Sequence, residues 1–315
     1  MTRAKKKARN TVRKPEAPIL YIAVTDDRGL DGFFHRYDKG PKVEINVLIS
    51  YAYLQGQASG LLKLKNQRKI KRLVLDSGAF SASTGKSTID VYEYALWLSR
   101  FGHYFDLVFS LDDSFDDLEH NRRNYEFIKS RIPKKDITLV PVCHATDKSG
   151  SQAVLEEVEA YVNDGCKYIA IGSKPRLTNE TLLELQAKYP NVRFHMFGRT
   201  DKNMLTEVLP YSADSATYAH RAGIGTILFR DESGESHTIY NGGRQDMPDR
   251  HVHWEDFDHK DEFQTQYKTW FGRELKYPEL IRQSTSHHLR QHINIMYFLD
   301  MQKRLRQLKQ AKDGM

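Results

Sequence analysis

Cysteine is scarce in this chain of 315 residues, in which only Cys143 and Cys166 occur. Two cysteines cannot build a disulfide scaffold or a cysteine-rich zinc module, so a reducing, intracellular setting is the default. Long apolar runs are also missing, because no stretch approaches the roughly 20 residues of a membrane span. The N-terminal residues lack the apolar segment of a signal peptide, and we therefore expect a cytoplasmic protein with no membrane partner.

Acidic residues are outnumbered, with 41 Asp and Glu against 48 Lys and Arg, which gives a net charge of +7. This balance favours a polyanionic partner over a neutral small molecule, although a basic soluble protein without such a partner is the alternative. Residues 1–16 carry seven basic side chains and almost nothing apolar. We expect a flexible basic arm over residues 1–17, which either contacts phosphates or is simply disordered.

Short apolar runs alternate with amphipathic segments from residue 19 onward. Several runs are continuously apolar, which is typical of parallel strands buried on both faces. The predicted strands are residues 19–24, 44–52, 72–76, 106–112, 138–145, 167–173, 193–198 and 212–217. Eight strands interleaved with helices predict an α/β fold, a (β/α)8 TIM-like barrel over residues 18–232.

Helix starts are indicated by capping residues. We expect Ser87 or Thr88 to cap a helix over 89–102, Asp116 one over 117–130, Ser149 or Ser151 one over 152–162, and Thr178 one over 179–189. Beyond the barrel, residues 233–315 are predicted to form a mostly helical basic extension. Its last segment spaces Leu289, Met296, Leu305 and Leu308 for a long amphipathic helix, with His292 or Ile293, Leu299, and Gln302 or Lys303 between them.

Polar residues or glycines fall at six predicted strand ends: Asp76, Asp112, His144, Gly172, Gly198 and Asp214. In a βα barrel the carboxyl ends of the strands form the face on which active sites are built. Two carboxylates there suit chemistry at a sugar anomeric carbon, with one attacking or stabilising the oxocarbenium-like centre and the other moving a proton. Asp76 and Asp214 are the candidate pair, and loop capping is the alternative role for either.

The ordered set "DSGAF", "VFSLDDS", "YIAIGS", "FHMFGRT" and "SADSATYAH" resembles the tRNA-guanine transglycosylase superfamily over residues 70 to 230. That family exchanges guanine for a 7-deazaguanine on a (β/α)8 barrel. The chain is most similar to the phage and bacterial branch that modifies DNA. The resemblance implies that Asp76 is the acid/base residue and Asp214 the nucleophile, although the sequence after Asp214 differs from that of the tRNA enzymes.

The resemblance also implies a base-binding set. Phe80 and Met196 would stack on opposite faces of the purine, with ordinary core packing as the alternative. Asp112 would read the guanine edge, Asp113 being the alternative register, and Gly172 would let the backbone approach the base. The family has a glutamine where this chain has Cys143 or His144, and His144 would donate the same bond.

Nucleic-acid contacts are expected from the basic arm, the C-terminal helix, and Lys174, Arg176, Arg199 and Arg221. The structural zinc of the tRNA enzymes, held by three cysteines and a histidine, has no counterpart here, because no cysteine follows Cys166. We therefore expect no cofactor and no metal. His251, His253 and His259 are the remaining candidates for zinc ligands, with solvated side chains as their alternative role.

The expected function is replacement of guanine in DNA by a 7-deazaguanine derivative, such as 7-cyano-7-deazaguanine, through a covalent aspartyl-sugar intermediate. Reaching the sugar in a duplex requires the nucleotide to be flipped out, and helper proteins that open the duplex are possible partners. The alternatives are the same exchange on tRNA, a non-catalytic nucleic-acid-binding barrel subunit, and a glycoside hydrolase on the same fold.

Overall fold

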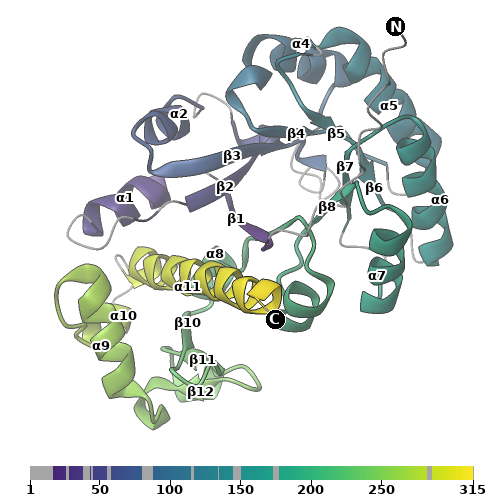
Figure 1. Cartoon of the computed structure of the whole chain (residues 1–315). Helices are drawn as coiled ribbons and strands as arrows, with labels where there is room; N and C mark the ends of the chain where they lie inside the picture. Colours follow the sequence, from purple (N-terminus) through teal and green to yellow (C-terminus); the bar gives the residue numbers. More distant parts are fainter. Residues whose placement is uncertain are drawn as a thin grey trace, which may run out of the picture.

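The predicted TIM-like barrel is confirmed by the computed structural model (Figure 1). The structure describes residues 17–25, 28–37, 43, 45–54, 58–79, 88–114, 117–133, 135–144, 150–172, 177–281 and 286–314. Almost all of the predicted basic arm therefore lies outside the described residues.

Parallel strands form the barrel, in the order β5-β4-β3-β2-β1-β9-β8-β7-β6. The strands are β1 (Ile19–Val24), β2 (Ile45–Ser50), β3 (Ile70–Asp76), β4 (Leu107–Phe109), β5 (Leu139–Val140), β6 (Val142–Cys143), β7 (Tyr168–Ile171), β8 (Arg193–Met196) and β9 (Ser212–Ser215). Seven of the eight predicted strand ranges contain one of these strands or, for 138–145, the pair β5 and β6, and the range 72–76 covers all of β3 except its first two residues.

β5 and β6 are two halves of one strand that is interrupted at Pro141, and this strand joins the two ends of the sheet. Ser110 N donates to Val140 O on the β4 side, and Ala170 N donates to Pro141 O on the β7 side, both at 2.9 Å. Proline has no N–H, so the ladder is broken at Pro141 while its carbonyl still pairs. With this strand counted once, the described strands make an eight-membered closed ring.

Helices cover the outside of the ring: α1 (Arg28–Arg36), α2 (Ala58–Asn66), α4 (Val91–Phe101), α5 (Leu118–Arg131), α6 (Gly150–Asn163), α7 (Asn179–Lys188) and α8 (Thr217–Gly223). Thr178 caps α7 as predicted. Two other predicted caps were wrong, because Asp90 caps α4 and Asp117 caps α5. Each of these aspartates directly precedes its helix, so its carboxylate reaches the free N–H groups of the first turn.

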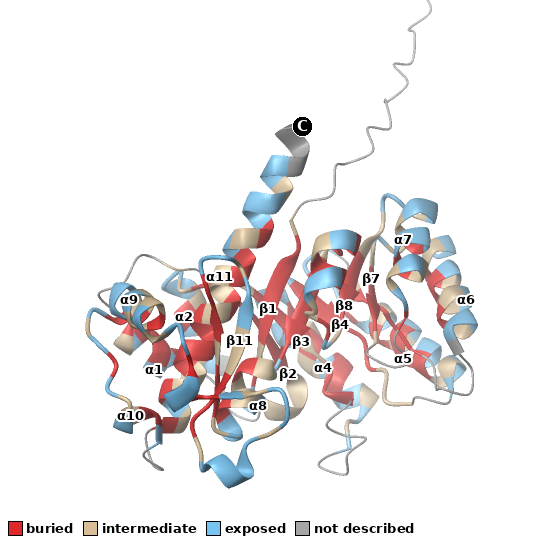
Figure 2. Ribbon diagram, turned by 90° about the horizontal axis from the view of Figure 1, so that it is seen from below, coloured by how far each residue is buried: buried red, intermediate tan, exposed pale blue. Residues whose placement is uncertain are grey.

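Alternate residues of each strand point to two different cores, as the period of a β-strand requires. Tyr21, Leu48, Val74 and Phe109 pack inside the barrel. Their neighbours Ile22, Val47, Leu73 and Val108 pack outward against the helices. Figure 2 shows the strands buried along their length, while the exposed residues lie on the outer sides of the helices.

The C-terminal part is not purely helical. A second sheet contains β10 (Thr226–Arg230), β11 (Ser236–Tyr240) and β12 (Val252–His253), followed by α9 (Lys260–Phe271), α10 (Pro278–Ile281) and α11 (Ser286–Gly314). The predicted boundary between residues 232 and 233 falls in the turn between β10 and β11, whose pairing makes them one hairpin. Trp254, Phe257 and Phe263 are buried, so this polar segment still contributes to the hydrophobic core.

The predicted long terminal helix is confirmed as α11, and it packs against α8, β10, α10 and β1 (Figure 1). Leu289, Met296 and Leu305 are buried as expected, whereas Leu308 is 50 % exposed. Residues between the predicted apolar positions, such as Ile295 and Phe298, are buried as well. The helix is therefore enclosed on several sides over its first half. No helix among the described residues is long and apolar enough to cross a membrane.

Two buried amides tie α11 to the rest of the fold. Gln302 accepts from Leu20 N and donates to Pro18 O, both at 2.7 Å. Asn294 accepts from Leu228 N at 2.7 Å and donates to Tyr218 O at 2.9 Å and Thr226 O at 3.2 Å. Because these groups have no water to replace a lost partner, α11 is held to the barrel by polar contacts as well as by apolar packing.

We predict that Asn294→Ala lowers the free energy of unfolding by about 2–4 kcal/mol, since it leaves one buried N–H without its partner and removes the bonds to two carbonyls. Urea unfolding followed by circular dichroism measures this loss. Gln310→Ala, at an exposed position of the same helix, is the control and should change stability by less than about 0.5 kcal/mol. Equal stability of the two variants would contradict the role given to Asn294.

Candidate active site at the carboxyl end of the barrel

The structure brings five of the predicted site residues to one end of the barrel. Asp76 is the last residue of β3, and Asp214 lies in β9. The other three follow β4, β6 and β7 and are Asp112, His144 and Gly172. Because all strands of the ring are parallel, their carboxyl ends surround a common mouth.

Asp76 is the acid whose ionisation is most strongly perturbed. Burial, together with the negative charges of Asp112 and Asp214, raises the pKa of Asp76 to about 8, even though Gly78 N donates to its Oδ2 at 3.1 Å. The carboxyl group therefore carries a proton at neutral pH. A protonated acid among ionisable neighbours is suited to donate a proton to a departing group.

The turn after Asp76 depends on Gly78. Its φ of +91° favours glycine, and a Cβ there would lie 2.5 Å from Ser50 Oγ and 2.6 Å from Ala52 Cβ. The turn thus packs directly on the segment after β2, with Ala79 buried beside it. Phe80, predicted to stack on a base, lies outside the described residues.

Asp214 is nearly buried and is held through one oxygen. Its Oδ1 accepts from Gly198 N at 2.9 Å and lies 3.3 Å from His195 Nε2. The other nitrogen of His195 lies 2.9 Å from Ser212 Oγ. Among the described residues no hydrogen bond engages Asp214 Oδ2, so one oxygen orients the side chain and the other is available for chemistry.

His195 was missed by the sequence prediction. Its side chain points inward from β8. Arg193 and Phe197, two residues to either side, lie on the same face because side chains alternate along a strand. This period of two within "RFHMFG" was the signal that could have identified it, whereas the prediction considered only the strand end.

Asp112 and His144 form a buried pair in the mouth. His144 Nδ1 lies 3.2 Å from Asp112 Oδ2, and Ser77 Oγ donates to Asp112 Oδ1 at 3.2 Å. His144 Nε2 lies 3.1 Å from Ser114 O. Burial opposes protonation of His144, but Asp112 and the Ser114 carbonyl outweigh it and raise its pKa. Both ring nitrogens are engaged, so His144 positions Asp112 here instead of presenting a free donor to a base.

Asp113, the alternative to Asp112 as the reader of the base edge, contacts a helix and not the mouth. Its Oδ1 lies 2.9 Å from His120 Nε2 and accepts from Asn124 Nδ2 at 2.9 Å. Both partners belong to α5, so Asp113 anchors that helix and Asp112 is the acid that reaches the mouth.

Glu157 of α6 is a second group that the sequence prediction missed. Burial raises its pKa to about 8, and the neighbouring His144 offsets this only in part. Nothing in the helical pattern of residues 152–162 distinguishes Glu157 from the other glutamates. Glu157 differs from them in its burial and in its contact with His144, and both arise only in the tertiary structure.

Gly172 has a different reason for lacking a side chain than the one expected. A Cβ at this position would lie 2.7 Å from His144 Cβ. The glycine therefore makes room for His144, and close approach of the backbone to a base is not needed to explain it.

Met196 does not line the mouth. It is 2 % exposed and belongs to the outer core between the strands and the helices. The expectation that Met196 stacks on a base is corrected by this position, because residue 196 faces the opposite side of β8 from His195. Phe197, which follows β8 on the face of His195, contacts Phe109 and His195 at ring-centroid distances of 4.8 and 4.7 Å.

The predicted phosphate contacts are only partly available. Arg199 is buried and donates to Asp201, Leu177 O and Asn179, so its guanidinium is used within the fold and the prediction for it is corrected. Arg221 is half-buried with its Nη1 3.0 Å from His251 Nε2. Lys174 and Arg176 lie outside the described residues.

A basic pocket of about 920 Å³ opens beside β1 and the segment after β9. Ala216, two residues after Asp214, is in its wall. Its cationic and imidazole lining comprises Arg28, His35, Arg36, His287, His288 and His292. Arg28 and Arg36 carry the positive charge of this lining, because burial lowers the pKa of His287 and lowers that of His292 to about 3. Their charge beside the mouth favours an anionic ligand that reaches the carboxylates from this side.

The three histidines considered for zinc do not gather. His251 lies beside Arg221, and His253 Nε2 lies 3.1 Å from Gly242 O. Only His259 joins a group of candidate metal ligands, with Asp231 and His237. That group lies in the C-terminal part and contains none of the acids at the mouth.

Comparisons with known proteins show no family. No family model matches the chain, and no curated protein matches it. Among solved structures the chain is similar to the orotidine 5'-monophosphate decarboxylase from Sulfolobus solfataricus, with a TM-score of 0.38 and 7 % sequence identity. The match covers 62 % of this chain and 87 % of that one.

We predict that Asp76→Asn stabilises the protein at alkaline pH. The unfolded carboxyl ionises near pH 4, whereas the folded one keeps its proton up to about pH 8, so the folded state binds more protons in this window and wild-type stability falls as pH rises through it. The variant should melt at least about 2 °C above wild type at pH 8, and the difference should vanish near pH 4.

Differential scanning calorimetry across this pH range tests the effect. Glu119→Gln, which removes an 81 % exposed carboxylate, should melt like wild type at every pH. A lower melting temperature for Asp76→Asn at pH 8 would show that Asp76 is ionised in the folded protein.

We also predict that Gly172→Ala destabilises the fold by about 1–3 kcal/mol, because its methyl group overlaps His144. Gly223→Ala is the matched control, since a Cβ there meets no atom within 4 Å. Urea unfolding should find the control equal to wild type or slightly more stable. A Gly172→Ala variant as stable as the control would disprove the packing role of Gly172.

Proposed function

We propose that this protein is a base-exchange transglycosylase that replaces guanine in DNA with a 7-deazaguanine derivative. The observation that carries the proposal is the pair Asp76 and Asp214, which share one barrel mouth but have contrasting surroundings. Pairs of acids whose environments differ in this way commonly divide the roles of proton donor and nucleophile. The motif resemblance over residues 70 to 230 supplies the substrate class.

In the proposed first step, Asp214 Oδ2 attacks C1′ of a deoxyguanosine. The bond from C1′ to the base nitrogen breaks, its electron pair passes to guanine, and the proton held by Asp76 neutralises the departing base. An ester between Asp214 and C1′ remains. The hydrogen bond from Gly198 N to Oδ1 fixes the side chain while the opposite oxygen reacts.

In the second step, the ionised Asp76 takes a proton from the incoming 7-deazaguanine. The base nitrogen then attacks C1′, the ester bond breaks and Asp214 is regenerated. Two displacements at the same carbon give net retention of configuration.

Asp112 is the proposed reader of the base edge. A carboxylate has about four lone-pair sites. The contacts with Ser77 and His144 leave capacity for an N–H of guanine on each oxygen. His144 acts as a positioning residue, because its two nitrogens already contact Asp112 and the Ser114 carbonyl.

The basic pocket beside β1 supports a polynucleotide substrate. Arg28, Arg36 and His288 line it together with Ala216, two residues after Asp214, and the phosphates flanking a flipped nucleotide would lie here. Contacts of this kind give binding that weakens as salt rises. They favour a nucleic acid over the neutral glycan of a glycoside hydrolase.

The test is an exchange assay with purified protein, labelled guanine or 7-cyano-7-deazaguanine, and either duplex DNA or tRNA. Wild type is expected to incorporate label into DNA and to form a covalent adduct that survives denaturation. Asp214→Asn should abolish both, because an amide cannot form the ester. Asp76→Asn should reduce exchange at least about 100-fold, the usual contribution of a general acid.

Asp113→Asn is the matched control, since it changes the neighbouring acid that anchors α5, and it should retain exchange. An undiminished adduct in Asp214→Asn would exclude the nucleophile assignment. Label found only in tRNA would replace the DNA substrate, and no exchange into either polymer would favour a non-catalytic barrel subunit.

A further inference from the structure

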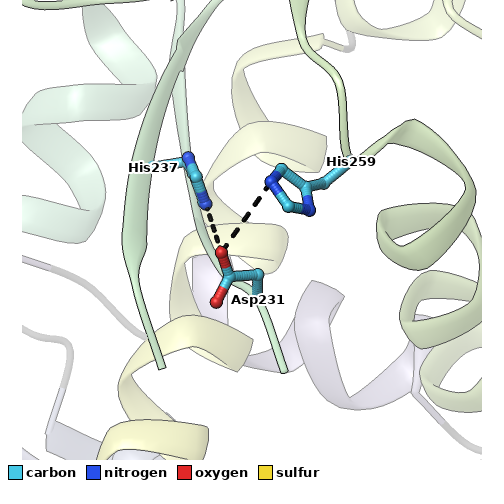
Figure 3. A group of neighbouring side chains, drawn as sticks. All are labelled: Asp231, His237 and His259. Atoms are coloured by element: carbon cyan, nitrogen blue, oxygen red, sulfur yellow. Dashed lines mark hydrogen bonds and ion pairs between the residues drawn. The ribbon is translucent and has the colours of Figure 1, made fainter. Parts of the chain in front are cut away.

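A second cluster of ionisable side chains lies outside the mouth, in the C-terminal part. Asp231 follows β10, His237 lies in β11, and His259 directly precedes α9 (Figure 3). His237 Nε2 is 2.8 Å and His259 Nε2 is 3.9 Å from the same oxygen, Asp231 Oδ2. One ligand atom from each residue lies within 4.8 Å of the others.

The loop between β10 and β11 prepares Asp231 for this arrangement. Ser233 Oγ and Glu235 N donate to Oδ1 at 2.6 and 2.9 Å, so that oxygen is already satisfied. The remaining oxygen, Oδ2, faces the two imidazoles (Figure 3).

The hydrogen bond between His237 and Asp231 does not include His259. At 3.9 Å, His259 Nε2 is too far from Oδ2 for a hydrogen bond, yet it is directed at the same point. In a tetrahedral zinc site with bonds of about 2.0–2.1 Å, ligand atoms are about 3.4 Å apart. The observed separations of 2.8 and 3.9 Å lie on either side of that value.

Glu262 supports His259 from behind. Its Oε2 lies 3.4 Å from His259 Nδ1, an arrangement that places the proton on Nδ1 and the lone pair on Nε2. Carboxylates in this position commonly orient metal-binding histidines. Among the described residues, the buried Glu262 Oε1 has no hydrogen-bond partner, so a polar atom beside the cluster is left unsatisfied.

The surroundings of the cluster are aromatic. Phe229 stacks on His237 and Phe257 contacts both imidazoles, with ring-centroid distances of 6.1, 5.4 and 5.8 Å. Asp231 is 3 % exposed, while the imidazole of His259 is 44 % exposed and leaves a path from solvent. An apolar shell with one open side limits water at the site and still lets an ion enter.

We propose that Asp231, His237 and His259 bind a single zinc ion that stabilises the C-terminal part. Two imidazoles and one carboxylate suit zinc, whereas calcium and magnesium prefer sets made of oxygen atoms. The ion takes Asp231 Oδ2 and the Nε2 atoms of the two histidines, and a water completes four-fold coordination. It joins the β10–β11 hairpin to the start of α9, two segments that no disulfide connects.

The test uses the tag-free full chain, treated with EDTA, dialysed and titrated with zinc chloride against a chromophoric chelator. Wild type is expected to bind one zinc per chain and to melt at a higher temperature when loaded. Cobalt(II) in place of zinc should give the intense visible absorption of a tetrahedral site. One zinc ion per chain is expected because Asp231, His237 and His259 form a single cluster.

His237→Gln and His259→Gln should each weaken zinc binding at least tenfold and remove the zinc-dependent rise in melting temperature. His251→Gln, a histidine of the same region outside the cluster, should behave like wild type. Because His259 is partly exposed, its variant keeps the fold even if the one at His237 does not, which circular dichroism checks. Binding below one tenth of an equivalent by wild type, or unchanged affinity in His259→Gln, would overturn the proposal.

Discussion

Enclosure of three carboxyl groups in one barrel mouth, where burial and then mutual repulsion oppose ionisation, is the constraint on which the candidate site depends. The strand interrupted at Pro141 closes the ring, so the acids at the carboxyl ends of β3, β4 and β9 cannot move apart. Each acid is accommodated differently. Asp214 accepts from Gly198 N beside His195, Asp112 is paired with His144, and Asp76 retains a proton. The chemical asymmetry that a two-acid mechanism needs therefore follows from the geometry of closure.

The strand that carries Asp214 is supported by a helix distant in sequence. β9 pairs with β1, and β1 is fixed near its start by Gln302 of α11. The first turn of the same helix places His287 and His288 in the wall of the basic pocket. The helix α11 thus supports the β1–β9 pair and also contributes to the surface beside the site. Residues 286–314 are therefore integral to the barrel, although they follow it in sequence.

The alternation of apolar strands with helices made the barrel predictable, and strand ends located Asp76, Asp112, His144, Gly172 and Asp214. The direction of individual side chains was harder to predict. Met196 was assigned to the mouth from a motif, although strand alternation places it in the outer core. Arg199 was assigned to phosphate, but its partners Leu177 and Asn179 come from a segment that only the tertiary structure brings near. The Asp231 cluster joins three segments, and only its member His259 was among the zinc candidates of the sequence.

Histidine is a suitable partner for the acids of the mouth because it leaves them reactive. An arginine beside Asp214 would engage both oxygens in a permanent bidentate pair and would occupy the space that a substrate needs. His195 contacts only Oδ1, and its other nitrogen is held by Ser212. In the Asp231 cluster, by contrast, two imidazoles face the same oxygen, which leaves no free lone pair directed at a substrate and suits a shared metal ion. Asp214 has one imidazole at one of its oxygens, which leaves the other oxygen for the proposed reaction. Asp231 has two imidazoles at the same oxygen, which is the arrangement of the proposed zinc ligands.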